Sequence, residues 1–500
     1  MRTCTMTVWA AVIVAVTSAA GPLRADPIAE QIRKAREAAL NSSVVVSYYV
    51  ERDDGVRADI RMLGTVVGPD NLVMFTSAAI SSQFALSQFH DFKLIVTKGD
   101  DIQTYAAEYL GKDDLAQVAF LRVTDPKAPK LPPLEFQTGV TLEIGDPVLS
   151  FTSLGEPDGY ARVIHLSRVG ARIDQPVTLW LTAEGLGAPG TPVVTLDGKA
   201  MGIVGFTRLN RGTNARPNWS LGEVIWPAER FMERLKNPPK GGSLVKRPWI
   251  GVQTVTPVTK DLAEYYKLGD RRGVVIGQIV EGGPAEKAGI KAEDLILALD
   301  GKDLKGTEGQ LVENFTNNLR ERKIGDTVAM EIWRAGKTET LKVTLVQEPK
   351  SAAEAERYKN TQVGLGVREM VTMDRLQREL PASESGVVVS FLDPAGWARD
   401  GGLQAGDIVK KVQDQDVKTL ADFRRVFDAE IKKKPKEIVL FVLRGKKDTQ
   451  LVRIETHWDA AEKPKADTPG APKPDAGGDK KPVEKKSDAG APPRAEKAPK

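Results

Sequence analysis

The side chains that could carry covalent or metal chemistry are few and widely spaced in this sequence. The single cysteine is Cys4, and the three histidines are His90, His165 and His457. This spacing fits no common metal-ligand pattern, and it excludes a disulfide or a cysteine nucleophile from residues 5–500. Hydrolysis would need a hydroxyl, such as that of Ser167 or Thr191, within hydrogen-bond reach of an imidazole.

Two glycine motifs could instead bind a peptide. Ile250-Gly251-Val252 and Leu365-Gly366-Val367 each place a glycine between apolar residues at a predicted strand entry. Glycine lets the backbone turn tightly and aim successive N–H groups at one carboxylate, while the peptide pairs as an added strand. The candidate binding residues are Trp249, Ile250, Gly251, Val252, Gly364, Leu365, Gly366 and Val367.

An amphipathic helix would supply the second wall of each peptide groove. The first is expected at about 307–319 and the second at about 420–431. Their apolar faces carry Leu311, Phe315 and Leu319, and Leu420, Phe423 and Phe427. Most of these side chains also suit a hydrophobic core, so the helices alone do not establish a binding site.

The glycine motifs lie inside an internal repeat. Gly273-Val274-Val275 recurs as Gly386-Val387-Val388, and the segment ending in Asp294 recurs in the segment ending in Asp407. The repeat is too long for a solenoid unit and predicts two copies of one domain. We place these copies at 245–349 and 360–457.

The region before the repeat is predicted to be β-rich. A helical segment is expected within 21–41, and short apolar runs punctuated by Gly, Pro and Asp follow over 42–236. Such spacing is typical of an all-β sandwich or barrel. A Pro/Gly-containing linker then leads into the first repeat copy.

The two ends of the chain indicate export and a disordered tail. Residues 1–20 have Arg2, a short apolar run and small residues at the end, which predicts a cleaved signal peptide; an uncleaved anchor is the alternative. Residues 458–500, rich in Pro, Ala and Lys, are expected to be disordered. The net charge is only +4 from 71 basic and 67 acidic residues, which argues against nucleic-acid binding. We therefore expect a periplasmic or secreted protein without a membrane span.

Together these motifs resemble a known family. Both repeat copies are similar to PDZ domains, and residues 42–457 as a whole resemble the HtrA family of trypsin-like serine proteases. The resemblance implies a mostly β fold: a trypsin-like double β-barrel, two PDZ domains (α+β, partly open β-barrels) and the disordered tail. It also implies a homo-oligomer, a trimer in related proteins.

The resemblance also assigns positions for a catalytic triad. Matching the family's segments places Ala79 at the histidine position, Gln117 at the aspartate position and Pro189 at the serine position. Because these side chains supply no base, charge or nucleophile, we expect a protein that is not an enzyme. A relocated triad using His90, His165, Ser167 or Thr191 is the exception to test.

The sequence therefore predicts a binding protein without metal or cofactor. It would bind C-terminal or extended segments of envelope proteins through its PDZ domains, as an adaptor, chaperone or protease regulator. One alternative is an active serine endopeptidase in protein quality control. Another is a structural envelope protein whose PDZ domains serve only assembly.

Overall fold

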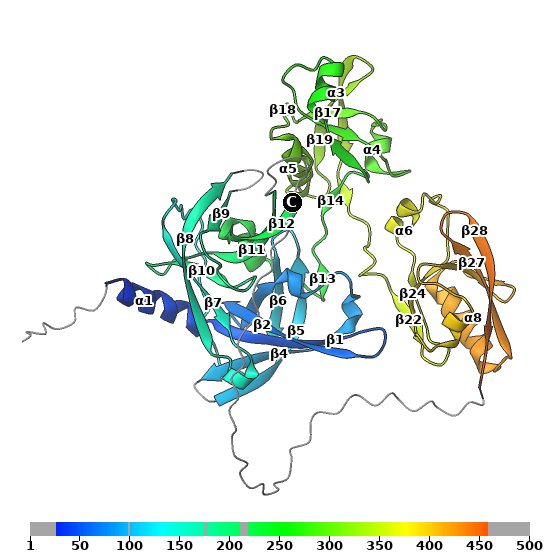
Figure 1. Cartoon of the computed structure of the whole chain (residues 1–500), viewed down its shortest axis with the longest axis horizontal. Coiled ribbons are helices and arrows are strands. Elements are labelled where there is room, and N and C mark those ends of the chain that lie inside the picture. Colours follow the sequence, from blue (N-terminus) through cyan, green and yellow to red (C-terminus); the bar gives the residue numbers. More distant parts are fainter. Residues whose placement is uncertain (1–26, 99–100, 175–177, 211–218, 459–500) are drawn as a thin grey trace, which may run out of the picture.

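The structure, a computed structural model, describes residues 27–98, 101–174, 178–210 and 219–458 (Figure 1). The predicted signal peptide lies outside these residues, as does the predicted tail beyond Trp458. The first described element is helix α1 (Pro27–Asn41). Within the described ranges, no helix has both the length and the apolar character needed to cross a bilayer.

The first barrel is formed by six strands. They are β1 (Ser43–Glu51), β2 (Arg57–Gly68), β3 (Leu72–Thr76), β4 (Phe89–Lys98), β5 (Asp101–Asp113) and β6 (Val118–Val123). The order is β5-β4-β1-β2-β3-β6, and pairing of β5 with β6 closes the barrel. The connection between β3 and β4 contains two short 3₁₀ turns, η1 (Ser77–Ala79) and η2 (Leu86–Gln88).

The second barrel is also closed. Its strands are β7 (Pro147–Ser153), β8 (Arg162–Ile173), β9 (Leu179–Thr182), β10 (Pro192–Thr195), β11 (Ala200–Asn210) and β12 (Trp219–Pro227). The order is β10-β11-β12-β9-β8-β7. Three short elements complete this part of the chain: η3 (Glu156–Asp158), η4 (Ala228–Arg230) and α2 (Met232–Lys236).

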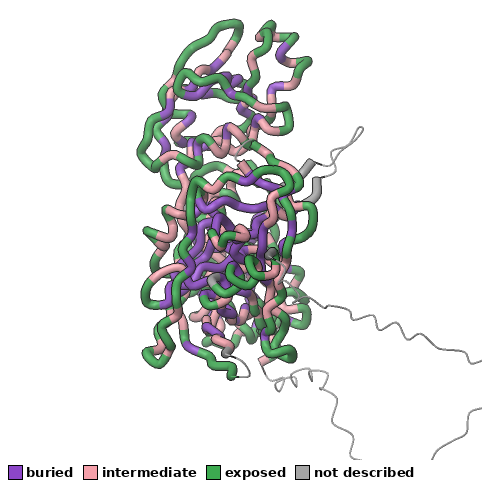
Figure 2. The backbone as a smooth tube through the Cα atoms, turned by 90° about the vertical axis from the view of Figure 1, so that its left-hand side faces the viewer, coloured by how far each residue is buried: buried purple, intermediate pink, exposed green. Residues whose placement is uncertain are grey.

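One hydrophobic cluster joins the two barrels and α1. It combines Met74 and Phe120 of the first barrel with Phe151 of the second, and Ala35 and Ala39 of α1 are fully buried against it. Figure 2 shows this buried interior as a continuous purple region. The two closed barrels form the trypsin-like double barrel that the sequence predicts.

The first repeat unit contains a five-strand path, β15-β16-β17-β19-β20, with β15 at its edge. The strands of the unit are β14 (Pro248–Trp249), β15 (Val255–Pro257), β16 (Val274–Ile276), β17 (Leu295–Leu299), β18 (Lys302–Asp303), β19 (Thr327–Arg334), β20 (Lys337–Thr344) and β21 (Val346–Gln347). The helices are α3 (Lys260–Tyr265), α4 (Pro284–Lys287) and α5 (Glu308–Arg320). Strand β13 (Ser243–Leu244), before the unit, pairs in parallel with β5.

The second repeat unit has the path β22-β23-β24-β25-β27-β28. Its strands are β22 (Arg357–Asn360), β23 (Leu365–Glu369), β24 (Val387–Leu392), β25 (Ile408–Val412), β26 (Gln415–Asp416), β27 (Glu437–Arg444) and β28 (Asp448–Glu455). The helices are α6 (Thr372–Gln377), α7 (Trp397–Asp400) and α8 (Leu420–Lys432). The two units differ at the sheet edge, because β22 covers an edge that is open in the first unit.

A buried ion pair recurs in both units. In the first, Arg334 Nε and Nη2 donate to the two oxygens of Asp294 at 2.6 and 2.5 Å. In the second, Arg444 donates to Asp407 at 2.8 and 2.7 Å. Both aspartates are almost completely buried. The paired side chains fix the turn before the following strand in each unit.

Removing the arginine of this pair should destabilise its unit strongly. We predict that Arg334→Ala lowers the unfolding free energy of the first unit by about 3 kcal/mol, because it leaves the buried Asp294 carboxylate uncompensated. Hydrogen exchange of the β17 and β19 amides measures this loss. The exposed Lys337 on the same hairpin gives the control, Lys337→Ala, which should change it by less than about 0.5 kcal/mol. Equal exchange in both variants would contradict the prediction.

Candidate functional site

The three predicted triad positions lie on segments that meet between the barrels. Ala79 ends η1, and the neighbouring Ser77 N–H donates to the carbonyl of Gln117 at 3.2 Å. Pro189 precedes Gly190, whose Cα is so close to Thr76 that an added Cβ would lie 2.6 Å from the Thr76 nitrogen. The β3 end, the residue before β6 and the loop before β10 therefore converge on one region.

Gln117 connects the two barrels there. Its Nε2 donates to the carbonyl of Phe206 at 2.9 Å, and its Oε1 accepts the Phe206 N–H at 3.2 Å. Gln117 adopts φ +58°, the left-handed conformation, which directs the side chain toward β11. An amide can satisfy a backbone donor and acceptor together, so Gln117 acts as a structural clamp between the barrels.

Tyr48 adds a second polar contact to the same region. Its hydroxyl donates to the carbonyl of Ala79 at 2.6 Å, and burial raises its pKa well above the usual value. Tyr48 is therefore a neutral donor that holds the η1 turn. Ala79 and Pro189 have no hydroxyl or imidazole, so hydrolysis at this junction requires a nucleophile and a base from other residues.

Among the described residues of the second barrel, one hydroxyl lies within hydrogen-bond distance of an imidazole. Thr152 Oγ1 lies 2.8 Å from His165 Nε2, across the β7–β8 hairpin. The backbone of Gly187 packs directly on this pair, because an added Cβ there would lie 2.3 Å from Thr152 Cγ2. Sequence reasoning named His165 but missed Thr152. The pairing of β7 with β8 is the signal that could have found it.

The other hydroxyls named from sequence bond to the backbone or to other hydroxyls. Ser167 Oγ donates to the carbonyl of Glu184 at 3.0 Å and also accepts its N–H. Thr191 Oγ1 donates to the carbonyl of Ala188 at 2.7 Å and lies 2.9 Å from Ser150 Oγ. His90 lies within β4 with its ring 5.3 Å from that of Tyr49. None of these arrangements pairs the named hydroxyls with an imidazole.

The first glycine loop presents free backbone groups at the open edge of its sheet. Gly251 has φ +80°, and its carbonyl accepts the Val280 N–H at 2.8 Å. Among the described residues, the N–H of the buried Gly251 has no acceptor. Because Gln253 and Thr254 bond toward β16, the N–H and C=O groups of Val252 and Val255 face the open edge.

Helix α5 lies beside this edge as the expected second wall. Leu311 and Phe315 of α5 are buried in the core of the unit, and Val252 and Val255 pack against the same core. An open edge strand, a glycine loop and a flanking helix are the arrangement to which an added strand with a terminal carboxylate can pair.

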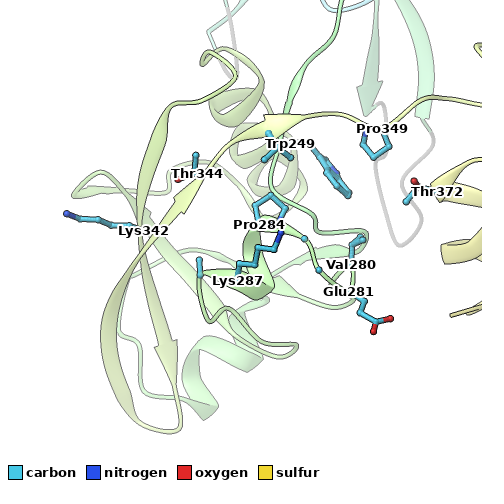
Figure 3. Close-up of a pocket in the computed structure, with 13 residues that line it drawn as sticks. Trp249, Val280, Glu281, Pro284, Lys287, Lys342, Thr344, Pro349 and Thr372 are labelled. Atoms are coloured by element: carbon cyan, nitrogen blue, oxygen red, sulfur yellow. The ribbon is translucent and has the colours of Figure 1, made fainter. Parts of the chain in front are cut away.

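A cavity lies next to the glycine loop. It has a volume of about 520 Å³ and is lined partly by Trp249, Pro284 and Lys287 of the first unit. Figure 3 shows these side chains gathered around it, with Thr372 of the second unit on the opposite side. The lining contains the basic residues Lys287 and Lys342 and the acidic residue Glu281, and the Lys342 side chain extends away from the cavity (Figure 3).

The second loop is placed two residues earlier than the sequence comparison predicts. Gly364, with φ +71°, accepts the Asp393 N–H as Gly251 accepts that of Val280. Gly366 lies within β23. The structural counterpart of Ile250-Gly251-Val252 is therefore Val363-Gly364-Leu365, and the pairing with Leu365-Gly366-Val367 is corrected.

Comparisons with known proteins agree with this architecture. Residues 248–345 match the family model of the PDZ domain. A probable periplasmic serine endoprotease DegP-like of Brucella suis is 27% identical over 402 residues, covering 78% of this chain and 72% of the relative. The chain is a homologue of the HtrA/DegP-type serine proteases.

Other DegP-like relatives show similar coverage. The corresponding protein of Rhizobium meliloti is 26% identical over 410 residues, covering 80% of this chain and 77% of the relative. The solved HtrA-type protease AlgW with decapeptide has 18% identity and a TM-score of 0.47 over 64% of this chain and 99% of that chain. The serine endoprotease from Yersinia pestis has 19% identity and a TM-score of 0.43 over 63% and 97%.

These relatives change one expectation from the sequence. They are named serine endoproteases, which contradicts the expectation that this DegP-like chain is not an enzyme. The interpretation of Ala79, Gln117 and Pro189 as a degenerate triad has no support from them.

The clamp at Gln117 gives a direct test of the barrel junction. We predict that Gln117→Ala lowers the unfolding free energy of the double barrel by about 1–2 kcal/mol, because both half-buried backbone groups of Phe206 lose their partner. Urea unfolding followed by tryptophan fluorescence measures the loss. Gln137→Ala, at an exposed position of the double barrel, is the matched control. The clamp is refuted if both variants unfold at the wild-type midpoint.

Proposed function

We propose that this DegP-like chain works in the periplasm by binding C-terminal or extended segments of envelope proteins through its first PDZ domain. The observation that carries the proposal is the N–H of the buried residue Gly251, which has no acceptor among the described residues and lies beside the open edge of β15. Buried backbone donors are nearly always paired, so this one favours an external acceptor. The relatives' names support the periplasmic location.

Assembly into a homo-oligomer would strengthen such binding. Several weak PDZ sites on one particle gain avidity when they engage one extended polypeptide. We propose that the oligomer retains bound segments of envelope proteins for protein quality control.

Peptide binding is tested with decapeptides carrying a free or an amidated C-terminus. We expect wild-type protein to bind the free carboxylate form at least tenfold more tightly, because amidation removes the charge that the loop amides would receive. Fluorescence anisotropy with the full-length protein provides the measurement. Equal affinity for both forms would show that the loop amides do not recognise the carboxylate. It would favour the alternative in which the PDZ domains serve only assembly.

The same titration with Gly251→Val tests the loop itself. A Cβ at Gly251 would lie 2.9 Å from Pro284 Cδ, and φ +80° disfavours valine, so affinity should fall at least tenfold. Gly309→Ala is the control, because its added Cβ meets no atom within 4 Å.

Endopeptidase activity is the second candidate, favoured by the relatives' names and by the pair of Thr152 and His165. In this version His165 would act as base toward the Thr152 hydroxyl. Gly187 carries no side chain over the pair, although its backbone packs against it.

Digestion of unfolded casein tests this candidate. We predict that His165→Gln and Thr152→Val each reduce cleavage by at least a hundredfold, while Ser167→Ala, whose hydroxyl bonds the Glu184 backbone, retains it. Cleavage that survives both substitutions would place the nucleophile elsewhere. No cleavage by wild-type protein at any temperature would eliminate the second candidate and leave the binding proposal intact.

A further inference from the structure

The edge that is open in the first repeat unit is occupied in the second by the chain itself. Strand β22 pairs antiparallel with β23, with Arg357 opposite Arg368 and Asn360 opposite Leu365. The N–H of Gly364 donates to the carbonyl of Asn360 at 3.1 Å. The loop amide that lacks an acceptor at Gly251 therefore has one in the second unit.

The side chains of β22 occupy the groove as a bound peptide would. The ring of Tyr358 meets those of Phe423 and Phe427 of α8 edge-on, at centroid distances of 5.6 and 6.2 Å. Its hydroxyl donates to Asp428, and burial together with this contact raises its pKa to about 12. The groove between β23 and α8 thus has an aromatic pocket with a carboxylate acceptor at its end.

The first residue of β22 and the residues just before it contact the first barrel. The carbonyl of Ala353 accepts the N–H of Leu86 in η2 at 3.2 Å. Arg357 Nη1 lies 3.3 Å from Asp53 Oδ2, and Gln88 of η2 donates to the same carboxylate at 3.1 Å. Residues 351–360, which we call the connector, therefore touch the second unit and the β3–β4 connection together.

An ion pair fixes the middle of the connector. Lys246 Nζ lies 2.6 Å from Glu354 Oε1, and Ser351 donates two further hydrogen bonds to Glu354. Although burial opposes the charged form, these contacts hold the pKa of Glu354 below its usual value. The pair is formed at neutral pH. Ala353 and Ala355 are almost fully buried on either side.

We propose that the connector is a built-in ligand of the second PDZ domain, and that its groove fits an extended segment bearing a tyrosine-like aromatic side chain. This inference rests on the proposed peptide binding and names the ligand class of the second groove. An incoming segment of that kind competes with β22. Its entry displaces β22 from β23 and breaks the contacts between the connector and η2. The element η2 lies in the same β3–β4 connection as Ala79.

The first experiment measures binding of a labelled peptide with the sequence of residues 351–360. Full-length Tyr358→Ala should bind it at least tenfold more tightly than wild type, because the variant's own β22 no longer fills the aromatic pocket. Glu356→Ala, at an exposed position directly before β22, is the matched control and should bind as wild type does. Equal affinity of Tyr358→Ala and wild type would overturn the proposal.

Hydrogen exchange gives a readout that does not depend on the peptide. In Tyr358→Ala the amide of Leu86 should exchange at least tenfold faster than in wild type, while β24 and β25 amides keep their protection. Unchanged exchange at Leu86 would overturn the coupling between groove and barrel. If Tyr358→Ala loses protection throughout the second unit, the variant Asp428→Asn is measured in its place. Its Leu86 amide should exchange faster than in wild type, by a smaller factor. An unchanged exchange rate at Leu86 would overturn the coupling.

These outcomes are separable from the proposed function. If the first PDZ domain does not bind free C-termini, the peptide competition at the second groove can still be measured, because Tyr358 lies in the second unit. Conversely, if Tyr358→Ala does not change peptide affinity at the second groove, Gly251→Val should still lower the affinity for C-terminal peptides.

Discussion

The pairing of backbone groups at a sheet edge is the interaction on which the binding surfaces of this chain depend. Each repeat unit has a strand that follows a glycine loop and borders an amphipathic helix. In the first unit the outer groups of Val252 and Val255 face an open edge. In the second, β22 pairs with the corresponding strand. The same fold thus presents one open groove and one closed groove, and the difference lies in a single short strand.

Much of the fold was predictable because it follows from short-range patterns. Short apolar runs separated by Gly, Pro and Asp predicted the barrel strands, and the recurrence of Gly273-Val274-Val275 indicated the duplication. The Asp–Arg pairs of Asp294 and Asp407 recur with it, because Arg334 and Arg444 also match in the repeated sequence. Helices α5 and α8 begin within one residue of their predicted starts.

The contents of the groove were not predictable, because they depend on long-range pairing. The segment Arg357–Asn360 is polar and short, so nothing in its composition marks it as a strand. The sequence allows either of two nearby glycines, Gly364 and Gly366, to occupy the loop position. The choice between them depends on φ and on the Asp393 hydrogen bond, which only the folded backbone shows. The Thr152–His165 contact was hidden for the same reason, since it requires the register of β7 and β8.

The short distance along the chain between β22 and its loop sets how the second groove responds to ligand. Only Thr361, Gln362 and Val363 separate Asn360 from Gly364. A strand held by so few residues has an effective concentration at its own groove of at least the order of millimolar. Free segments at trace levels cannot compete with it. In the proposed competition, an incoming segment must therefore reach a comparable local concentration before it displaces β22 from β23.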